Sequence, residues 1–276
     1  MTDLPVPDDR ASTGPDGTPS GPARSVENTS EGLPAVPPAA HEVFGARLET
    51  AVRYAEFLAA DGVLRGLIGP REVPRLWDRH LLNCAALAEL IPVGTTVVDV
   101  GSGAGLPGLV LAVARPDLSV VLVEPLARRC AFLTEAVRLL GLAASVEVVR
   151  ARAEEVARDH PDGMAPIVTA RAVAPLDRLV GWCLPLVESD GRLLAMKGSS
   201  AATEIAEHRA AVVRAGGSDP ALRLCGSRWL DPPTVVVEIG WRDGGRTGGG
   251  LVRGKARRSV RGATDRRAGR SRRREP

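Results

Sequence analysis

The residues with the clearest chemical potential form a glycine-rich turn. In chain order, this turn contains Asp99, Gly101, Gly103, Gly105, Leu106, Pro107 and Gly108. Glycine adopts positive φ and lets the backbone approach a ligand closely. Asp99 precedes the first glycine by two residues, where its carboxylate can pair with an ammonium group, and Leu106 is expected to lie over the bound molecule. The turn is therefore a candidate binding site for a small molecule.

Two cofactors suit such a turn, a nicotinamide dinucleotide and S-adenosylmethionine. Gly103, Gly105 and Gly108 formally satisfy the dinucleotide pattern G-x-G-x-x-G. A pyrophosphate would be repelled by the carboxylate of Asp99, whereas the methionine end of S-adenosylmethionine carries an ammonium group that this carboxylate attracts. The pattern favours S-adenosylmethionine. A nicotinamide-dependent oxidoreductase and a glycine turn without a ligand remain as alternatives.

Acidic residues follow the next two expected strands. Glu124 ends a strand expected over residues 119–125, 23 residues after Gly101, where a carboxylate can accept hydrogen bonds from both ribose hydroxyls. This feature suits both cofactors equally. Ala153 and Glu154 follow a strand expected over 145–151, where an acidic loop can reach the adenine amine and a backbone N–H the ring. Alternatively, Glu154 marks the start of a helix, since Glu is favoured in the first turn.

Cationic residues lie at the edge where a methyl acceptor would bind. The candidates are Arg171, Arg152 and Lys197, with Arg79 and His80 as possible neighbours. The turn around Arg171 lacks the Asn/Asp-Pro-Pro-aromatic sequence of enzymes that methylate exocyclic amines, and it lacks the Pro-Cys pair of enzymes with a cysteine nucleophile. No His/Asp dyad indicates a general base, and His80 alone favours a structural role. An acceptor that needs no base, such as guanine N7, fits this set, with catalysis mostly by positioning.

The elements that must position these residues alternate between strands and helices. Short apolar runs predict strands over 95–101, 119–125, 145–151, 166–172 and 191–198, and helical periodicity predicts helices over 108–116, 126–141, 175–187 and 201–217. Two further strands, 221–225 and 234–241, follow without a helix between them and predict an antiparallel pair. The alternation predicts a doubly wound α/β domain with helices on both faces of a parallel sheet. Helices expected over 43–60 and 72–90 precede it and are expected to cap one edge of the sheet.

Composition divides the 276-residue chain into three parts. Residues 1–40, with eight prolines, and the Gly- and Arg-rich residues 242–276 lack a core-forming pattern, so we expect both to be disordered around a folded domain over 41–241. Residues 242–276 carry thirteen Lys/Arg and three Asp/Glu, a net charge of +10, which leaves −7 for the rest of a chain whose net charge is +3. A flexible basic tail suits a polyanion such as RNA, and a passive extension is the alternative.

The remaining sequence features favour a cytoplasmic protein. The four cysteines, Cys84, Cys130, Cys183 and Cys225, are scattered without the spacing of metal ligands, so we expect reduced thiols and no metal. The sequence shows neither a secretory leader nor an apolar run of about 18 residues that would span a membrane. We expect no contact with membranes.

Five segments together resemble the bacterial small-subunit ribosomal RNA guanine-N7 methyltransferases, also called the glucose-inhibited division protein B family. They occur in family order over roughly residues 45–215 and are Arg79-His80-Leu81-Leu82, the turn from Asp99 to Gly108, Arg152-Ala153-Glu154-Glu155, Thr169-Ala170-Arg171-Ala172 and Leu194-Ala195-Met196-Lys197-Gly198. The resemblance implies a Rossmann-like class I methyltransferase sheet with S-adenosylmethionine contacts at Gly101, Leu106, Ala153, Glu154 and Arg171. Many members have Asp in place of Glu124, and Asp-Ser in place of Asn83-Cys84.

The activity implied by the resemblance is transfer of a methyl group to N7 of a guanine in the decoding-region loop of 16S ribosomal RNA. The expected partner is this RNA or the small ribosomal subunit, and we expect a monomer. The alternatives are a methyltransferase of the same fold that acts on another RNA or a small molecule, a nicotinamide-dependent oxidoreductase, and a non-catalytic RNA-binding protein.

Overall fold

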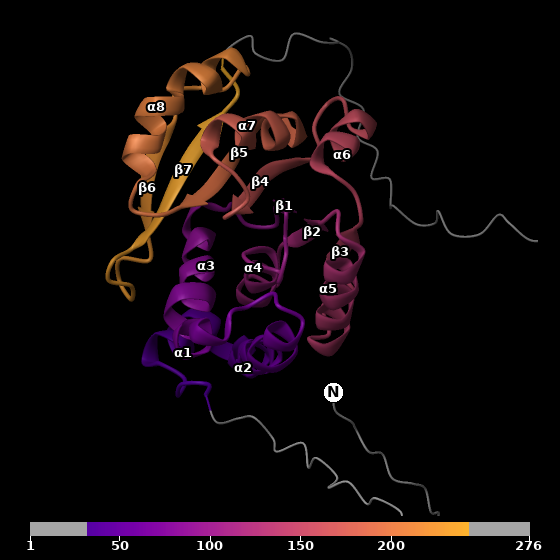
Figure 1. Ribbon diagram of the computed structural model, residues 1–276, viewed down its shortest axis with the longest axis vertical. Coiled ribbons are helices and arrows are strands. Elements are labelled where there is room, and N and C mark those ends of the chain that lie inside the picture. Colours follow the sequence, from indigo (N-terminus) through magenta and orange to yellow (C-terminus); the bar gives the residue numbers. More distant parts are fainter. Residues whose placement is uncertain (1–31, 243–276) are drawn as a thin grey trace, which may run out of the picture.

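The computed structural model describes residues 32–242, which build one seven-stranded sheet with helices on both faces (Figure 1). The strands are β1 Thr96–Val100, β2 Ser119–Val123, β3 Val146–Val149, β4 Ala165–Arg171, β5 Val187–Lys197, β6 Ala221–Cys225 and β7 Thr234–Gly240. The helices are α1 Pro38–Phe44, α2 Leu48–Phe57, α3 Asn83–Ala85, α4 Gly108–Ala114, α5 Ala127–Leu139, α6 Ala153–Asp159, α7 Leu176–Cys183 and α8 Ala201–Arg214. Shorter helical turns cover Gly45–Arg47, Leu58–Gly62, Pro70–Arg75, Leu76–Leu82, Ala86–Leu90 and Leu184–Leu186.

The sheet has the strand order β3-β2-β1-β4-β5-β7-β6. Strands β1 to β5 run parallel, and β7 pairs antiparallel with both β5 and β6. The predicted doubly wound α/β fold and the terminal antiparallel pair are confirmed. Because β1 to β5 are parallel, their carboxyl ends meet at one edge of the sheet, called the carboxyl edge below, where ligands bind in such folds.

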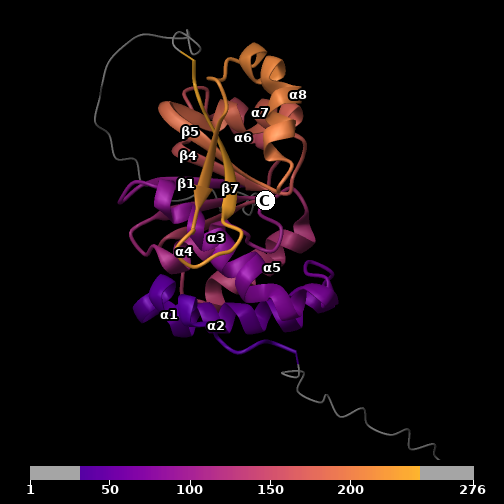
Figure 2. The ribbon, with the colours of Figure 1, turned by 90° about the vertical axis from the view of Figure 1, so that its left-hand side faces the viewer.

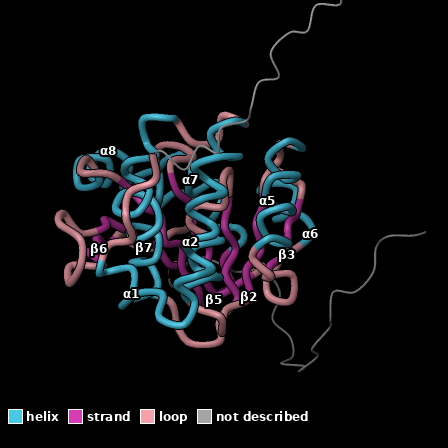
Figure 3. Tube along the Cα trace, turned by 90° about the horizontal axis from the view of Figure 1, so that it is seen from below, coloured by secondary structure: helices cyan, strands magenta, loops and turns pink. Residues whose placement is uncertain are grey.

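Three layers surround the sheet. Helices α6, α7 and α8 cover one face, α3, α4 and α5 cover the other, and α1 and α2 lie outside α4 (Figures 1 and 2). Helix α4 is buried on every side, from Leu109 to Val113, and such a helix needs cover on both sides. The N-terminal helices provide the outer cover, which Figure 3 shows from below.

Two predictions about the N-terminal region were wrong in detail. The N-terminal helices form a layer over α4, continued by the turn Ala86–Leu90 toward β6 and β7, instead of capping an edge of the sheet. Helix α1 begins at Pro38, three residues before the predicted start of the domain, and Ala40 is already fully buried. The prolines at 37 and 38 suggested disorder, but proline also suits the first turn of a helix. Residues 1–31 and 243–276 of the predicted disordered segments lie outside the described residues.

The described residues were also compared with the predictions on membrane spans, metal sites and cysteines. Among residues 32–242, no helix is long and apolar enough to cross a membrane. In the same range, no three or more His, Cys, Asp or Glu side chains are grouped so that they could hold a metal ion. All four cysteines are free and buried, in agreement with the prediction of reduced thiols.

Candidate active site

The glycine-rich turn leaves β1 at the carboxyl edge and leads into α4. Gly101, Gly103 and Gly105 have φ values of 70°, 56° and 90°, in the region that favours glycine. A Cβ atom on Gly101 would lie 2.8 Å from a methyl group of Val173, so the site also has no space for a larger residue there. The turn exposes the backbone of residues 101–104 to a cavity of about 250 Å³. This loop cavity is further lined by Leu67, Ile68, His80, Leu106, Arg129, Arg171 and Ala172.

A tyrosine from the N-terminal layer fixes the turn. The hydroxyl of Tyr54, on α2, donates a hydrogen bond of 2.6 Å to the backbone oxygen of Ala104. Burial raises the pKa of this phenol well above its ordinary value, so the hydroxyl remains a donor. Sequence reasoning missed Tyr54, although it is the single tyrosine of the chain and lies in a predicted helix. A buried tyrosine hydroxyl ordinarily needs a partner.

Asp99 lies beneath the turn and not on the cavity wall. It is fully buried, and its Oδ2 accepts a hydrogen bond of 3.0 Å from the N–H of Gly108 at the start of α4. Its Oδ1 is buried without a hydrogen-bond partner. Burial raises the pKa of Asp99 to about 7, against the opposing effect of the Gly108 N–H. Asp99 thus anchors helix α4 to β1 and leaves one oxygen unsatisfied, which is costly in the interior and marks a position adapted to a ligand.

Glu124 stiffens the same turn from the end of β2. Its side chain is 1% exposed, its Oε2 accepts from the N–H of Gly103 at 3.0 Å, and its Oε1 accepts from the N–H of Leu126 at 3.0 Å. Arg129 Nη1 lies 3.7 Å from Oε2. A carboxylate has about four acceptor sites, but this buried side chain does not line the loop cavity.

The segment after β3 begins helix α6. Ala153 is buried and Glu154 is exposed in its first turn, while Glu155 Oε2 accepts a 2.8 Å hydrogen bond from the N–H of Arg152. Glu154 thus lies at the start of a helix, and its contact with adenine stays a prediction. The Arg152 side chain is exposed, and β2 and β1 separate β3 from β4. The structure therefore does not bring Arg152 together with Arg171.

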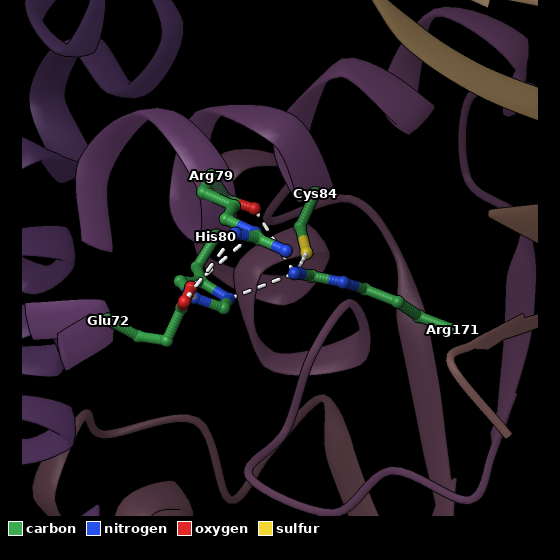
Figure 4. Close-up of polar contacts among 5 residues, drawn as sticks. All are labelled: Glu72, Arg79, His80, Cys84 and Arg171. Carbon is green, nitrogen blue, oxygen red and sulfur yellow. Dashed lines mark hydrogen bonds and ion pairs between the residues drawn. The ribbon is translucent and has the colours of Figure 1, made fainter. Parts of the chain in front are cut away.

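Arg171 ends β4 and reaches into the N-terminal layer (Figure 4). Its Nη1 donates to Cys84 Sγ at 2.9 Å, and its Nη2 donates to the backbone oxygen of Arg79 at 3.1 Å and to His80 Nδ1 at 2.9 Å. These bonds engage three of the five N–H donors of a guanidinium. The acceptors carry no charge, so they orient the Arg171 guanidinium without neutralising it.

His80 is held from both sides of its ring. Its Nε2 lies 3.0 Å from Glu72 Oε2, opposite the contact of Nδ1 with Arg171, and its side chain is only 10% exposed (Figure 4). Burial and the charge of Arg171 lower the pKa of His80, against the opposing effect of Glu72. His80 therefore has no free ring nitrogen for a general base. Sequence reasoning missed Glu72, although it lies eight residues before His80 in the same predicted helix.

Lys197 ends β5, beside Arg171, but its charge is compensated. Its Nζ donates to Glu204 Oε1 at 2.7 Å and to the backbone oxygen of Ala174 at 2.9 Å. Glu204 Oε1 also accepts from the N–H of Leu176 at 2.6 Å. The Lys197–Glu204 pair thus connects β5, α8 and the start of α7.

A second cavity of about 360 Å³, called the strand cavity, opens between the ends of β4 and β5. It is lined by Arg79, Asn83, Arg171, Ala172, Met196, Lys197 and Gly198. Arg171 and Ala172 also line the loop cavity, so the two cavities meet at these residues. Ala172 has a φ of 55°, unusual for a residue with a side chain. Backbone conformations of this kind concentrate at functional sites.

Comparison with known proteins identifies the family of this chain. Residues 47–228 match the family model described as rRNA small subunit methyltransferase G. A curated relative of that name from Salinispora tropica is 65% identical over 75% of this chain and 86% of its own length, and one from Nocardioides sp. is 53% identical over 90% and 96%. Among solved structures, a mitomycin 7-O-methyltransferase aligns with a TM-score of 0.47 and 20% identity over 74% of this chain and 68% of that chain. On the family match and the identities, the chain belongs to the ribosomal RNA small subunit methyltransferase G family.

Proposed function

We propose that this methyltransferase transfers a methyl group from S-adenosylmethionine to N7 of a guanine in the decoding-region loop of 16S ribosomal RNA. The names of the relatives support small-subunit ribosomal RNA as the substrate. One observation supports N7 as the acceptor atom. The loop and strand cavities meet at Arg171 and Ala172. The described residues that line them include no Asp, Glu, Tyr or Cys, and the one histidine, His80, has both ring nitrogens engaged.

The loop cavity suits the cofactor. When bound, S-adenosylmethionine supplies a methyl group on a positively charged sulfonium. Residues 101–104 lie open to its amino-acid end, and Leu106 covers the bound molecule. The contact of Glu124 with the ribose stays a prediction, because its carboxylate is buried behind the turn. The start of α6, at Ala153 and Glu154, receives the adenine. Asp99 is buried beneath the turn, and in its ionised form its carboxylate favours a cationic ligand above the turn.

The strand cavity suits the acceptor base. The lone pair of guanine N7 is free at neutral pH, so no side chain has to remove a proton. Arg79 and the two unused donors of Arg171 can hydrogen-bond the neighbouring O6, since arginine is a frequent partner of this edge of guanine. The residues then act by alignment of N7 with the methyl group, which is an effective form of catalysis.

The direct test is to map 7-methylguanine in 16S ribosomal RNA from cells with and without this protein. We expect one modified guanine in the decoding-region loop that disappears with the gene and returns with the wild-type gene, but not with Gly101→Val. Modification confined to another RNA, or to another atom of guanine, would overturn the proposal. The monomeric state expected from the sequence stays a prediction. Sedimentation of the purified protein tests this.

A further inference from the structure

We infer that Glu72 is a positioning residue that acts through a neutral His80 to hold the Arg171 guanidinium at the junction of the two cavities. Its effect on catalysis rests on the proposed function. The three side chains come from the turn Pro70–Arg75, the turn Leu76–Leu82 and strand β4, and Figure 4 shows them in one connected series.

The direction of the hydrogen bonds follows from the chemistry of the groups. A guanidinium has donors and no acceptor, so His80 Nδ1 must accept the 2.9 Å bond from Arg171 Nη2. The single ring hydrogen of a neutral His80 then lies on Nε2 and is donated to Glu72 Oε2 at 3.0 Å. A carboxylate on the far nitrogen of a histidine fixes its tautomer and its orientation, as is common behind metal-bound histidines.

The charged groups around His80 show why it must remain neutral. The positively charged side chains of Arg171 and Arg79 and the negatively charged carboxylate of Glu72 act on His80. Arg79 Nε also lies 3.5 Å from Glu72 Oε2, so the carboxylate is shared. A proton on His80 Nδ1 would place an N–H against the N–H of Arg171 and add a like charge. The guanidinium would then lose one of its three anchors and leave the position where it faces both cavities.

Two substitutions of His80 separate positioning from packing. The side-chain oxygen of Asn can occupy the place of Nδ1, whereas the longer Gln side chain imitates Nε2. His80→Asn therefore keeps an acceptor for Arg171, and His80→Gln keeps only the contact with Glu72. We expect His80→Gln to lower kcat at saturating RNA by about 10- to 100-fold, the range expected for misplacement of a positioning group. His80→Asn is expected to retain a larger share of kcat than His80→Gln does. Its kcat should also no longer fall at acidic pH, because the Asn side chain does not titrate.

Glu72 is tested by rescue. Glu72→Ala is expected to lower kcat more than it raises KM for RNA, and Glu72→Gln, which can still accept from Nε2, is expected to restore most of the loss. His208→Asn, in helix α8 on the other face of the sheet, is the matched control. Thermal unfolding of each variant verifies that it is folded. Equal kcat and equal pH profiles for His80→Asn and His80→Gln would overturn the inference.

A second readout does not depend on catalysis. Nitrogen NMR of the full chain, labelled at its four histidines, reports the tautomer and the titration of His80. We expect a hydrogen on Nε2 and a pKa below the ordinary value of about 6.5, and Arg171→Ala should raise this pKa because it removes a like charge. A hydrogen on Nδ1 would overturn the inference. If the wild type methylates no ribosomal RNA, the proposed function fails, and this spectrum still decides the arrangement of His80.

Discussion

Arg171 and Lys197 end two neighbouring parallel strands, yet the protein treats their charges in opposite ways. Strands β4 and β5 are in register so that Arg171 pairs with Met196, the residue before Lys197. The guanidinium of Arg171 is held by a thiol, a backbone oxygen and a neutral imidazole. The ammonium of Lys197 lies 2.7 Å from the Glu204 carboxylate.

This difference predicts that the charge of Arg171 serves a ligand and that the charge of Lys197 serves the structure. Neutral acceptors orient a cation and leave its field at the cavity, whereas a carboxylate cancels most of that field. Both residues line the strand cavity, so their proximity to a ligand does not distinguish them. The nature of their hydrogen-bond partners distinguishes the two residues, and the following predictions test this distinction.

The largest effect is expected for Arg171. Arg171→Ala should lower kcat by roughly 100-fold at saturating RNA, because it removes the charge and the donors that align the acceptor. Arg171→Lys keeps the charge but not the planar fork that reaches three acceptors at once, so its kcat should lie between those of the wild type and Arg171→Ala. Single-turnover methylation measures both. Full activity in Arg171→Ala would remove Arg171 from the catalytic set.

Lys197 is expected to affect stability more than turnover. Lys197→Met leaves Glu204 without its charged partner, and loss of a charge-assisted hydrogen bond costs about 1–3 kcal/mol. Urea unfolding should show this loss, with kcat lowered less than in Arg171→Ala. Glu204→Gln is the matched variant, and a double-mutant cycle isolates the pair. A larger fall in kcat for Lys197→Met than for Arg171→Ala would reverse the comparison.

Asp99 is a third case, a buried carboxyl without a charged partner. Its pKa is raised by burial to about 7, above the ordinary value near 3.9. Its stabilising contribution is therefore fully present below about pH 4 and is lost as the pH rises through about 7. Asp99→Asn cannot ionise, so its stability relative to the wild type should be greater at pH 8 than at pH 5, while its affinity for S-adenosylmethionine falls. Calorimetry at both pH values measures these changes, and a pH-independent difference in stability would contradict this account of Asp99.

The smallest effect on turnover is expected for the basic tail, most of which lies outside the described residues. The tail after Trp241 has no aromatic residue on which a base could stack. Its charges, unlike that of Arg171, are therefore expected only to attract phosphate groups. A chain ending at Arg242 should bind RNA more weakly and with a flatter salt dependence, at nearly unchanged kcat. Binding at several salt concentrations checks this, and equal slopes would leave the tail as a passive extension.

The sequence predicted those features of the fold and the site that depend on residues close together in the chain. The strands and the glycine turn follow from local patterns and were predicted correctly in position, as were Arg171 and Lys197 at the strand ends, whereas Arg152 lies apart from them. The partners of these residues were not. Tyr54 contacts a backbone oxygen 50 residues away, and Arg171 reaches residues 87 and 91 positions earlier. No periodicity encodes such contacts, although Arg79 and His80 were named in advance as possible neighbours of Arg171.

The outer layer over α4 has a consequence for biosynthesis. Helices α1 and α2 are translated before the helix that they cover, so their apolar faces, including Tyr54 and Ala55, lack part of their native contacts until Val113 has been added. At elongation rates of about 5–20 residues per second, this interval lasts roughly 3–12 s. During that time the nascent chain exposes part of the apolar surface of these two helices.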